Sequence, residues 1–335
     1  MAPAACRRTF PVALMLGMVL ALLPLSVLQA AAAPPPPPAS VVPEWTIDDQ
    51  GRGSLTLRMG QGLIAVSIDD AHLAVGLPAV TVWLQKAARA LIGFFGRYPV
   101  PMVHINITVD GEPGAHDGVT HEGRHISISL GPGTRDSDLA DDWIITHEMF
   151  HLSFPDLDDR HLWIEEGLAT YLEPLARARI GDVSVDSVWQ QLVEGLPQGQ
   201  PGPGDGGLEN THTWGRTYWG GCLYCLLADC TIRSRSHGRY ALDDCLRAIL
   251  AAGGDGSQEW SLERTLAIGD AAVHLTVLED LYQQLGLHAV TEDLPALWTR
   301  LGVTERHGRM SYDDQAPWAD IRLALTRPLA VPPRP

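Results

Sequence analysis

Basic residues are scarce in this sequence of 335 residues, which holds 24 lysines and arginines against 40 aspartates and glutamates, a net charge of −16. The basic residues that are present form no cluster or stripe. A protein that neutralises the phosphates of DNA or RNA needs such a stripe, so we exclude nucleic acid as a partner. We interpret the acidity as a contribution to solubility.

Long hydrophobic runs are also rare. One run, from Phe10 to Leu28, is long enough to cross a bilayer. Arg7 and Arg8 precede it and alanines follow it at 30–33, the pattern of a secretory signal peptide. We therefore predict a signal peptide at residues 1–33, a proline-rich spacer at 34–42, and a secreted or periplasmic protein with no stable membrane association after cleavage. A retained membrane anchor is the alternative interpretation.

Cysteines are few, and the mature chain would keep only Cys222, Cys225, Cys230 and Cys245. An even number of cysteines in an exported protein makes disulfides plausible. Cys222 and Cys225 fall in one apolar helical stretch, where a bridge would strain the helix, so we expect them to be core residues. Cys230 and Cys245 lie on successive predicted helices and are the pair that we expect to be bridged.

What the sequence does contain is His147-Glu148-Met149-Phe150-His151. Residues four apart lie on one face of a helix, so His147 and His151 can bind the same metal ion. Glu148 points beside that ion, where its carboxylate can accept a proton from a water molecule that the metal activates. A helix with two solvated histidines is the alternative. It is disfavoured because the flanking residues indicate a buried segment, in which unpartnered imidazoles are costly; these residues are Leu139, Trp143, Ile144, Phe150 and Leu152.

Two histidines leave a catalytic zinc ion in need of a third protein ligand. A third histidine six residues after His151 would define a metzincin, but Leu157 occupies that position. Glu165 and Glu166, on the next predicted helix, are the candidates. Adjacent helical residues cannot both face the metal, and helical periodicity does not choose between them.

The order of predicted elements indicates an α+β protein. Residues 54–69 predict a β-hairpin around glycines 60 and 62, and residues 103–109 and 126–130 predict strands separated by a glycine-rich turn that carries His116, His121 and His125. The first predicted helix covers 78–98, and the motif helix begins near Ser137 or Asp138 and ends before Pro155. Further helices are predicted at 163–179, 185–196, 218–233, 240–252 and 272–285, with a mobile loop at 197–210 and a closing strand at 321–325. We therefore expect one catalytic domain at 43–335, β-rich at 43–135 and helical at 136–335, with the site between the halves.

Two further segments resemble a known group of enzymes. Residues 162–171, Leu-Trp-Ile-Glu-Glu-Gly-Leu-Ala-Thr-Tyr, resemble the segment of gluzincin aminopeptidases in which the acidic residue before glycine binds zinc. Residues 218–221, Tyr-Trp-Gly-Gly, resemble the Tyr-x-Lys-Gly helix of the same group, and the continuation at 240–244 is similar to the glycyl aminopeptidase branch. The resemblance implies a thermolysin-like zincin catalytic domain with Glu166 as the third zinc ligand and Tyr218 as the residue that stabilises the oxyanion. Thr170 lies one turn after Glu166, where it would orient a metal ligand; a surface threonine is the alternative.

The sequence departs from that group in several places. Gly220 replaces the usual lysine, and the Gly-x-Met-Glu-Asn motif that anchors a free amine in the aminopeptidase N group is missing. From its length we also expect neither the large β-rich front domain nor the PDZ domain of the glycyl aminopeptidase branch.

These features together predict a secreted peptidase with one zinc ion, held by His147, His151 and Glu166, and a peptide or protein as its substrate. Glu148 would act as the general base and Tyr218 as the oxyanion donor. A catalytically silent binding protein of the same fold and a zinc hydrolase of a non-peptide substrate are the alternatives. The sequence leaves open the oligomeric state and the choice between exopeptidase and endopeptidase.

Overall fold

The computed structural model describes residues 44–329. The predicted signal peptide at 1–33 and the spacer at 34–42 lie outside the described residues. Within residues 44–329, no helix is both long and apolar enough to cross a membrane.

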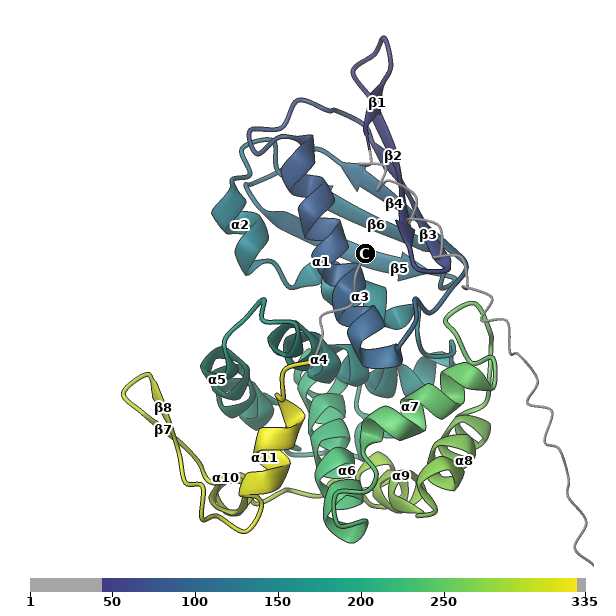
Figure 1. Ribbon diagram of the computed structural model, residues 1–335. Coiled ribbons are helices and arrows are strands. Elements are labelled where there is room, and N and C mark those ends of the chain that lie inside the picture. Colours follow the sequence, from purple (N-terminus) through teal and green to yellow (C-terminus); the bar gives the residue numbers. More distant parts are fainter. Residues whose placement is uncertain (1–43, 330–335) are drawn as a thin grey trace, which may run out of the picture. The chain divides into compact units, whose positions relative to one another are not determined.

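A six-stranded mixed sheet forms the first half of the described chain, in the order β1-β2-β3-β4-β6-β5 (Figure 1). Its strands are β1 (Thr46–Ile47), β2 (Gly53–Met59), β3 (Gly62–Ile68), β4 (Met102–Thr108), β5 (Ala115–His121) and β6 (His125–Leu130). The predicted hairpin is confirmed, since β2 and β3 pair antiparallel through a turn at Gly60, whose φ of 62° suits glycine. β4 pairs parallel with both β3 and β6, and β5 pairs antiparallel with β6 at one edge.

One face of this sheet is covered by α1 (Leu77–Phe95), which crosses it in Figure 1. Pro78 lies in the first turn of the helix, and Gly96 ends it in the left-handed conformation. The strands alternate in burial, so Leu57, Ile64 and Ile105 pack beneath the helix while Arg58 and His104 are exposed on the opposite face. The predicted helix at 78–98 is therefore confirmed, with an earlier end.

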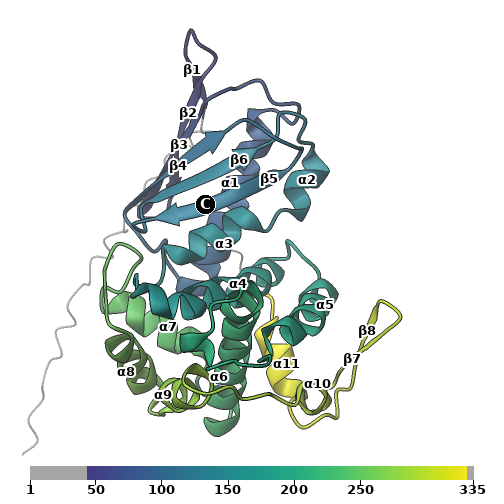
Figure 2. The same ribbon diagram turned by 180° about the vertical axis from the view of Figure 1, so that it is seen from behind.

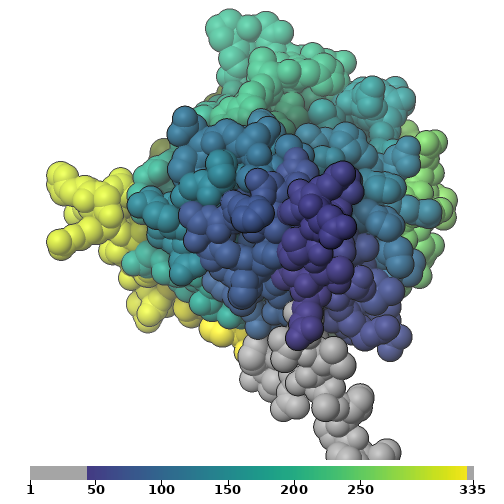
Figure 3. Space-filling view, turned by 90° about the horizontal axis from the view of Figure 1, so that it is seen from above, coloured from purple at the N-terminus to yellow at the C-terminus, as the bar shows by residue number. Residues whose placement is uncertain are grey.

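The second half is mainly helical. Its α-helices are α2 (Asp136–Asp141), α3 (Ile144–His151), α4 (Leu162–Arg179), α5 (Val185–Gly195), α6 (Gly221–Arg235), α7 (Leu242–Ala251), α8 (Leu262–Val273), α9 (Val277–Leu281), α10 (Leu294–Leu301) and α11 (Ala319–Leu325). Shorter 3₁₀ or π-helical segments are η1 (Asp159–His161), η2 (Leu196–Gly199), η3 (Leu208–Asn210), η4 (Gly215–Gly220) and η5 (Tyr282–Gly286). A hairpin of β7 (Val303–Arg306) and β8 (Arg309–Tyr312) projects beside the helices, drawn in yellow in Figure 3. The predicted α+β class, a small sheet with a helix followed by a helical half, is confirmed.

The position of α3 connects the two halves. It packs against β5 of the sheet on one side and against α4 on the other, as Figure 2 shows. Phe150 and Met149 of α3 are buried, and the Phe150 ring packs edge-on against Phe94 of α1, with ring centroids 6.0 Å apart. The helix that carries His147 and His151 is therefore held by contacts with both halves.

The prediction of one continuous motif helix is wrong, because the chain breaks between α2 and α3 at Asp142. Asp142 has an extended backbone, with φ −64° and ψ 134°. Its carboxylate accepts hydrogen bonds from the indole nitrogen of Trp83, at 2.8 Å, and from the backbone nitrogen of Ile144, at 3.1 Å. These hydrogen bonds cap the start of α3 and tie Asp142 to Trp83. They stabilise the extended backbone of Asp142 by more than a continuous helix would gain there.

Three other sequence predictions are also wrong. The glycine-rich turn after β4 contains a strand, β5, which pairs with β6 although it carries Asp117, Gly118 and other poor strand formers. The predicted closing strand at 321–325 lies in α11, where Ile321 and Leu325, four residues apart, are both buried. The single helix predicted at 272–285 is divided in the structure. Its residues form the end of α8, a turn in which His274 has a positive φ, and then α9 followed by η5.

The expected bridge between Cys230 and Cys245 is also absent. All four cysteines of the described residues are free thiols, and all four are buried. Burial raises the pKa of Cys230, so its thiol stays protonated. We conclude that these cysteines act as small apolar residues of the helical core.

Candidate metal centre

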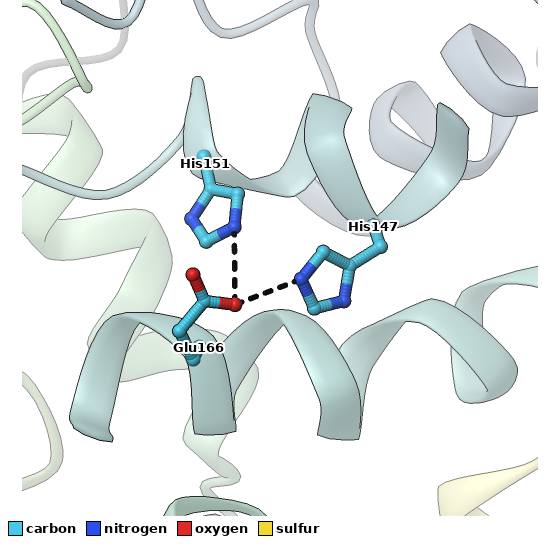
Figure 4. Close-up of side chains that lie close together, drawn as sticks. All are labelled: His147, His151 and Glu166. Carbon is cyan, nitrogen blue, oxygen red and sulfur yellow. Dashed lines mark hydrogen bonds and ion pairs between the residues drawn. The ribbon is translucent and has the colours of Figure 1, made fainter. Parts of the chain in front are cut away.

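Three side chains converge where α3 faces α4 (Figure 4). The Nε2 atoms of His147 and His151 lie 3.0 Å and 3.7 Å from Oε2 of Glu166. Donor atoms about 2.1 Å from a tetrahedral zinc ion lie about 3.4 Å from one another. The arrangement of two imidazole nitrogens and one carboxylate oxygen therefore fits a zinc ion, and within residues 44–329 it is the one cluster of three or more potential metal ligands.

Glu165 and Glu166 have different positions in the structure, a difference that helical periodicity does not predict. Glu166 faces the two imidazoles, whereas Oε1 of Glu165 accepts a hydrogen bond from the backbone nitrogen of Leu157 at 3.2 Å. Burial acts to raise the pKa of Glu166, but hydrogen bonds and charges of both histidines outweigh it and lower that pKa. Burial raises the pKa of Glu165 to about 8.

The negative charges around the histidines suit a bound cation. Burial acts to lower the pKa of His151, yet its hydrogen bond to Glu166 and the charges of Glu166, Glu148 and Glu165 together raise that pKa to about 9. The His151 imidazole thus holds a proton at neutral pH, and a bound metal ion would provide positive charge in place of that proton. Metal binding at this site must displace that proton.

Glu148, the predicted general base, is buried and lines the same hollow as His151 and Glu166. Its Oε2 accepts a hydrogen bond of 2.8 Å from the hydroxyl of Thr120 on β5. Gly118 of the same strand lies so close that a Cβ there would be 3.0 Å from Cγ of Glu148 and 2.4 Å from Cγ2 of Ile144. The edge strand therefore packs directly against the carboxylate and orients it, which the sequence does not indicate.

Tyr218 lies on the π-helical segment η4, on the other side of the site. Its ring stacks on that of His147, with centroids 6.2 Å apart and planes 26° apart. Burial raises the pKa of Tyr218 to about 12, and the charges of Glu166 and Glu148 act in the same direction. The phenol is therefore protonated at neutral pH and able to donate a hydrogen bond.

Two glycines set the distance between the helices that carry Glu166 and Tyr218. A Cβ on Gly167 would lie 2.3 Å from the backbone of Gly221, and a Cβ on Gly221 would lie 1.9 Å from the carbonyl oxygen of Trp163. The backbones of α4 and of the start of α6 are thus in direct contact beside the site. These glycines are part of the two resembling segments, and close backbone approach is a physical reason for them.

Alanine at Gly221 is expected to destabilise the protein by about 1–3 kcal/mol or more, because its methyl group would overlap the Trp163 carbonyl. Gly221 has helical backbone angles, φ −65° and ψ −40°, so helix propensity alone would favour the change. Gly202→Ala is the matched control, since a Cβ there meets nothing within 4 Å. Denaturant unfolding of both variants measures the difference, and a loss below about 0.5 kcal/mol for Gly221→Ala would contradict the contact.

Several residues of the site were missed or misread by sequence reasoning. The sequence predicts a buried Trp143, but 49% of it is exposed, and Trp214 is 61% exposed. The carboxylate of Glu209, in the segment predicted as a mobile loop, accepts hydrogen bonds from Trp163 and pairs with Nδ1 of His161, at 3.1 Å and 2.9 Å. That contact fixes the segment before Tyr218 to the start of α4. Thr170 is buried and lines the same cavity as His147.

Two hollows meet at the candidate metal centre, and Tyr218 lines both. The larger has a volume of about 750 Å³ and lies on the side of His147 and Thr170. The smaller, of about 280 Å³, is lined by His151 and, among the described residues, by these acidic groups: Glu122, Glu148, Asp156, Glu165 and Glu166. A molecule that extends from one hollow into the other passes the three convergent side chains.

Comparisons with known proteins establish the class of the fold. No protein-family model matches the sequence, and no curated protein matches it. Among solved structures, an aminopeptidase N family protein from Idiomarina loihiensis is similar over 76% of this chain and 49% of that chain, with 15% identity and a TM-score of 0.58. A mutant M1 zinc metallopeptidase from Deinococcus radiodurans, solved with a Tyr-Ser-Ala substrate, is similar over 73% of this chain and 53% of that chain, with 15% identity and a TM-score of 0.50.

The fold is that of an M1 zincin catalytic domain. The chain spans about half the length of these solved structures, and at this identity the likeness concerns the fold alone. The expected resemblance to gluzincins is thus supported at the level of the fold. The glycyl aminopeptidase branch stays a prediction.

Proposed function

We propose that the protein is a zinc-dependent peptidase, with zinc bound by His147, His151 and Glu166. The observation that carries this proposal is the convergence of these three donors beside a buried carboxylate, Glu148, that is not among them. A zinc ion bound there would supply a Lewis acid that polarises a water molecule and the carbonyl of the substrate. Three protein ligands leave a position open for that chemistry.

The chain's own residues then have separate tasks. Glu148 accepts a proton from the attacking water and returns it to the leaving amine. The Thr120 hydroxyl holds its carboxylate in place through the 2.8 Å hydrogen bond. Tyr218, which is protonated at neutral pH, donates a hydrogen bond to the oxyanion that develops on the substrate.

The edge strand supports a peptide as the substrate. β5 pairs with β6 along one side and, within the described sheet, is the last strand on the other side. An extended peptide can pair with such an edge through main-chain hydrogen bonds, whatever its sequence. Thr120 and Gly118 of β5 contact Glu148, so a peptide bound along this edge passes the general base.

The smaller hollow favours substrates with a free amino terminus. Its acidic lining would stabilise an ammonium group next to the metal centre. The solved M1 metallopeptidase with the Tyr-Ser-Ala substrate has the same fold, which supports a peptide ligand for this chain as well. We therefore propose aminopeptidase activity, despite the missing Gly-x-Met-Glu-Asn motif. We also propose export of the protein, on the basis of residues 1–33.

A peptide library tests the proposed function. The purified, zinc-loaded protein is expected to cleave peptides, to lose activity with a chelator and to regain it with zinc, as followed by mass spectrometry of the products. Peptides with free amino termini are expected to be cleaved faster than acetylated copies. A protein that binds one equivalent of zinc and cleaves no peptide would be a silent member of the fold, or a hydrolase of other substrates.

Replacement of Tyr218 by phenylalanine is expected to lower kcat by about 10²–10³-fold, because the hydrogen bond to the oxyanion is lost. The stacking of the ring on His147 is kept, so KM and metal content should change little. Steady-state kinetics and metal analysis check this, with Tyr282→Phe, a tyrosine of η5 that lines neither hollow, as the control. A kcat within threefold of the starting protein would remove Tyr218 from the mechanism.

A further inference from the structure

The larger hollow has a lining that the proposed reaction does not require. Its volume of about 750 Å³ lies within the range of about 300–1,000 Å³ that is typical of ligand sites. It extends from His147 between α4 and α5, and its apolar lining is dominated by three tryptophans, Trp143, Trp214 and Trp219. A cleft for backbone hydrolysis alone needs no such volume.

Two of these tryptophans are exposed and line the same hollow, and exposed apolar surface gathered in a groove marks ligand-binding sites. Trp143 is 49% exposed and Trp214 is 61% exposed. They are the two most exposed aromatic residues of the described chain, and both line this hollow.

Rings form a continuous row along the hollow and up to the metal centre. Trp214 stacks on Tyr218, with centroids 5.7 Å apart and planes 28° apart, and Tyr218 in turn stacks on His147. The ring of Trp143 lies nearly perpendicular to that of His147, with centroids 5.5 Å apart. A flat ring that enters the hollow can therefore stack on Trp214 or Trp143 while its backbone stays next to the metal ligands.

Apart from the exposed Asp141, the charged groups that line the hollow are paired. Arg177 donates to Glu173 at 2.9 Å and to Asp182 at 2.8 Å, and its remaining nitrogen donates to the carbonyl of Ala140. Lys86 pairs with Asp182 at 2.8 Å. The charges of Glu173 and Asp182 are thus balanced by two cations, so these groups require no compensating charge from a ligand. Burial also raises the pKa of Glu173 to about 7, which further reduces any attraction for a cation.

We propose that this hollow is a specificity pocket for an uncharged aromatic side chain of the peptide, at a position next to the cleaved bond. The proposal rests on the proposed function for its substrate class, but the pocket can be tested apart from catalysis. A basic side chain would meet Arg177, and an acidic one would meet Glu173 and Asp182. A small side chain would leave both exposed tryptophans uncovered.

Two measurements test the pocket, with pairs of peptides that differ only in phenylalanine or alanine at one position. The first is kcat/KM on the zinc-loaded enzyme, and we expect the phenylalanine peptide to be favoured at least tenfold at one position. The second is binding to zinc-loaded Glu148→Gln protein, by calorimetry and by the fluorescence of the tryptophans, and we expect tighter binding of the phenylalanine peptide.

Variants assign the preference to the pocket. Trp143→Ala and Trp214→Ala are each expected to reduce the preference for phenylalanine by about threefold to tenfold. Both side chains are largely exposed, so truncation should leave the fold intact, which thermal unfolding checks. Leu323→Ala is the control, because Leu323 is 54% exposed on α11 and does not line the hollow.

The outcomes separate the two proposals. Preferential binding of the aromatic peptide without cleavage would overturn the peptidase and keep the pocket. Chelator-sensitive cleavage with no aromatic preference, or with a preference for arginine, lysine or acidic residues, would overturn the pocket and keep the peptidase. A preference that both tryptophan variants retain would also overturn the pocket, as would failure to bind the phenylalanine peptide at all.

Discussion

Glutamine in place of Glu148 is expected to lower kcat by about 10²–10⁴-fold while the protein keeps its metal. Glu148 is not one of the three convergent donors, so its loss removes a proton acceptor and leaves the metal ligands in place. Glutamine has nearly the same shape and can still accept the hydrogen bond from Thr120. The fall in rate should therefore come from the lost basicity rather than from a rearranged site.

The measurement for Glu148→Gln combines peptide hydrolysis with elemental analysis of the purified protein. Glu263→Gln is the control, because Glu263 is an exposed carboxylate of α8 that lines neither hollow. Near-normal turnover in Glu148→Gln would rule out the proposed general base. Loss of the metal in this variant would show that Glu148 is a ligand and not a base.

Glutamine at Glu166 is expected to abolish stoichiometric metal binding, whereas glutamine at Glu165 is expected to preserve it. Loss of an outer-shell partner already weakens metal sites by about 10–100-fold, and loss of a ligand should exceed that. Glu166 lies 3.0 Å from His147 and 3.7 Å from His151. Glu165 instead accepts from the backbone nitrogen of Leu157, and the glutamine oxygen can do the same.

The comparison of these two variants is informative because the residues are adjacent, alike in chemistry and both largely buried. Zinc affinity is measured by competition with a chromogenic chelator, and peptide hydrolysis is measured in parallel. Equal zinc affinity in the two variants would refute the assignment of the third ligand. A loss of zinc in Glu165→Gln alone would exchange their roles.

Much of the candidate site could be read from the sequence, because its parts are local. The spacing of His147 and His151 requires only one turn of helix to bring them together. The strand alternation at 54–69 likewise requires only the pairing of neighbours across a short turn. Both features are as predicted, and so is the α+β order of elements.

Other features depended on residues far away in the sequence. The break at Asp142 is stabilised by Trp83, which is 59 residues earlier. β5 has a weak strand sequence, and it forms because β6 pairs with it and α3 packs beside it. Ile321 and Leu325 suited a strand as well as a helix, and the helical core that buries them decided the outcome.

By itself, the sequence determined the order of the elements and the histidine pair with its glutamate, since these follow from periodicity within one or two turns. Only the tertiary structure decided which of two adjacent glutamates faces the imidazoles, and how close Tyr218 lies to them. It decided also that two tryptophans distant in sequence stand beside one hollow. The physical reason is that these relations depend on the packing of α4 against α3 and α6. Between α4 and α6 the contact of Gly167 with Gly221 sets the spacing. No local sequence pattern encodes that distance.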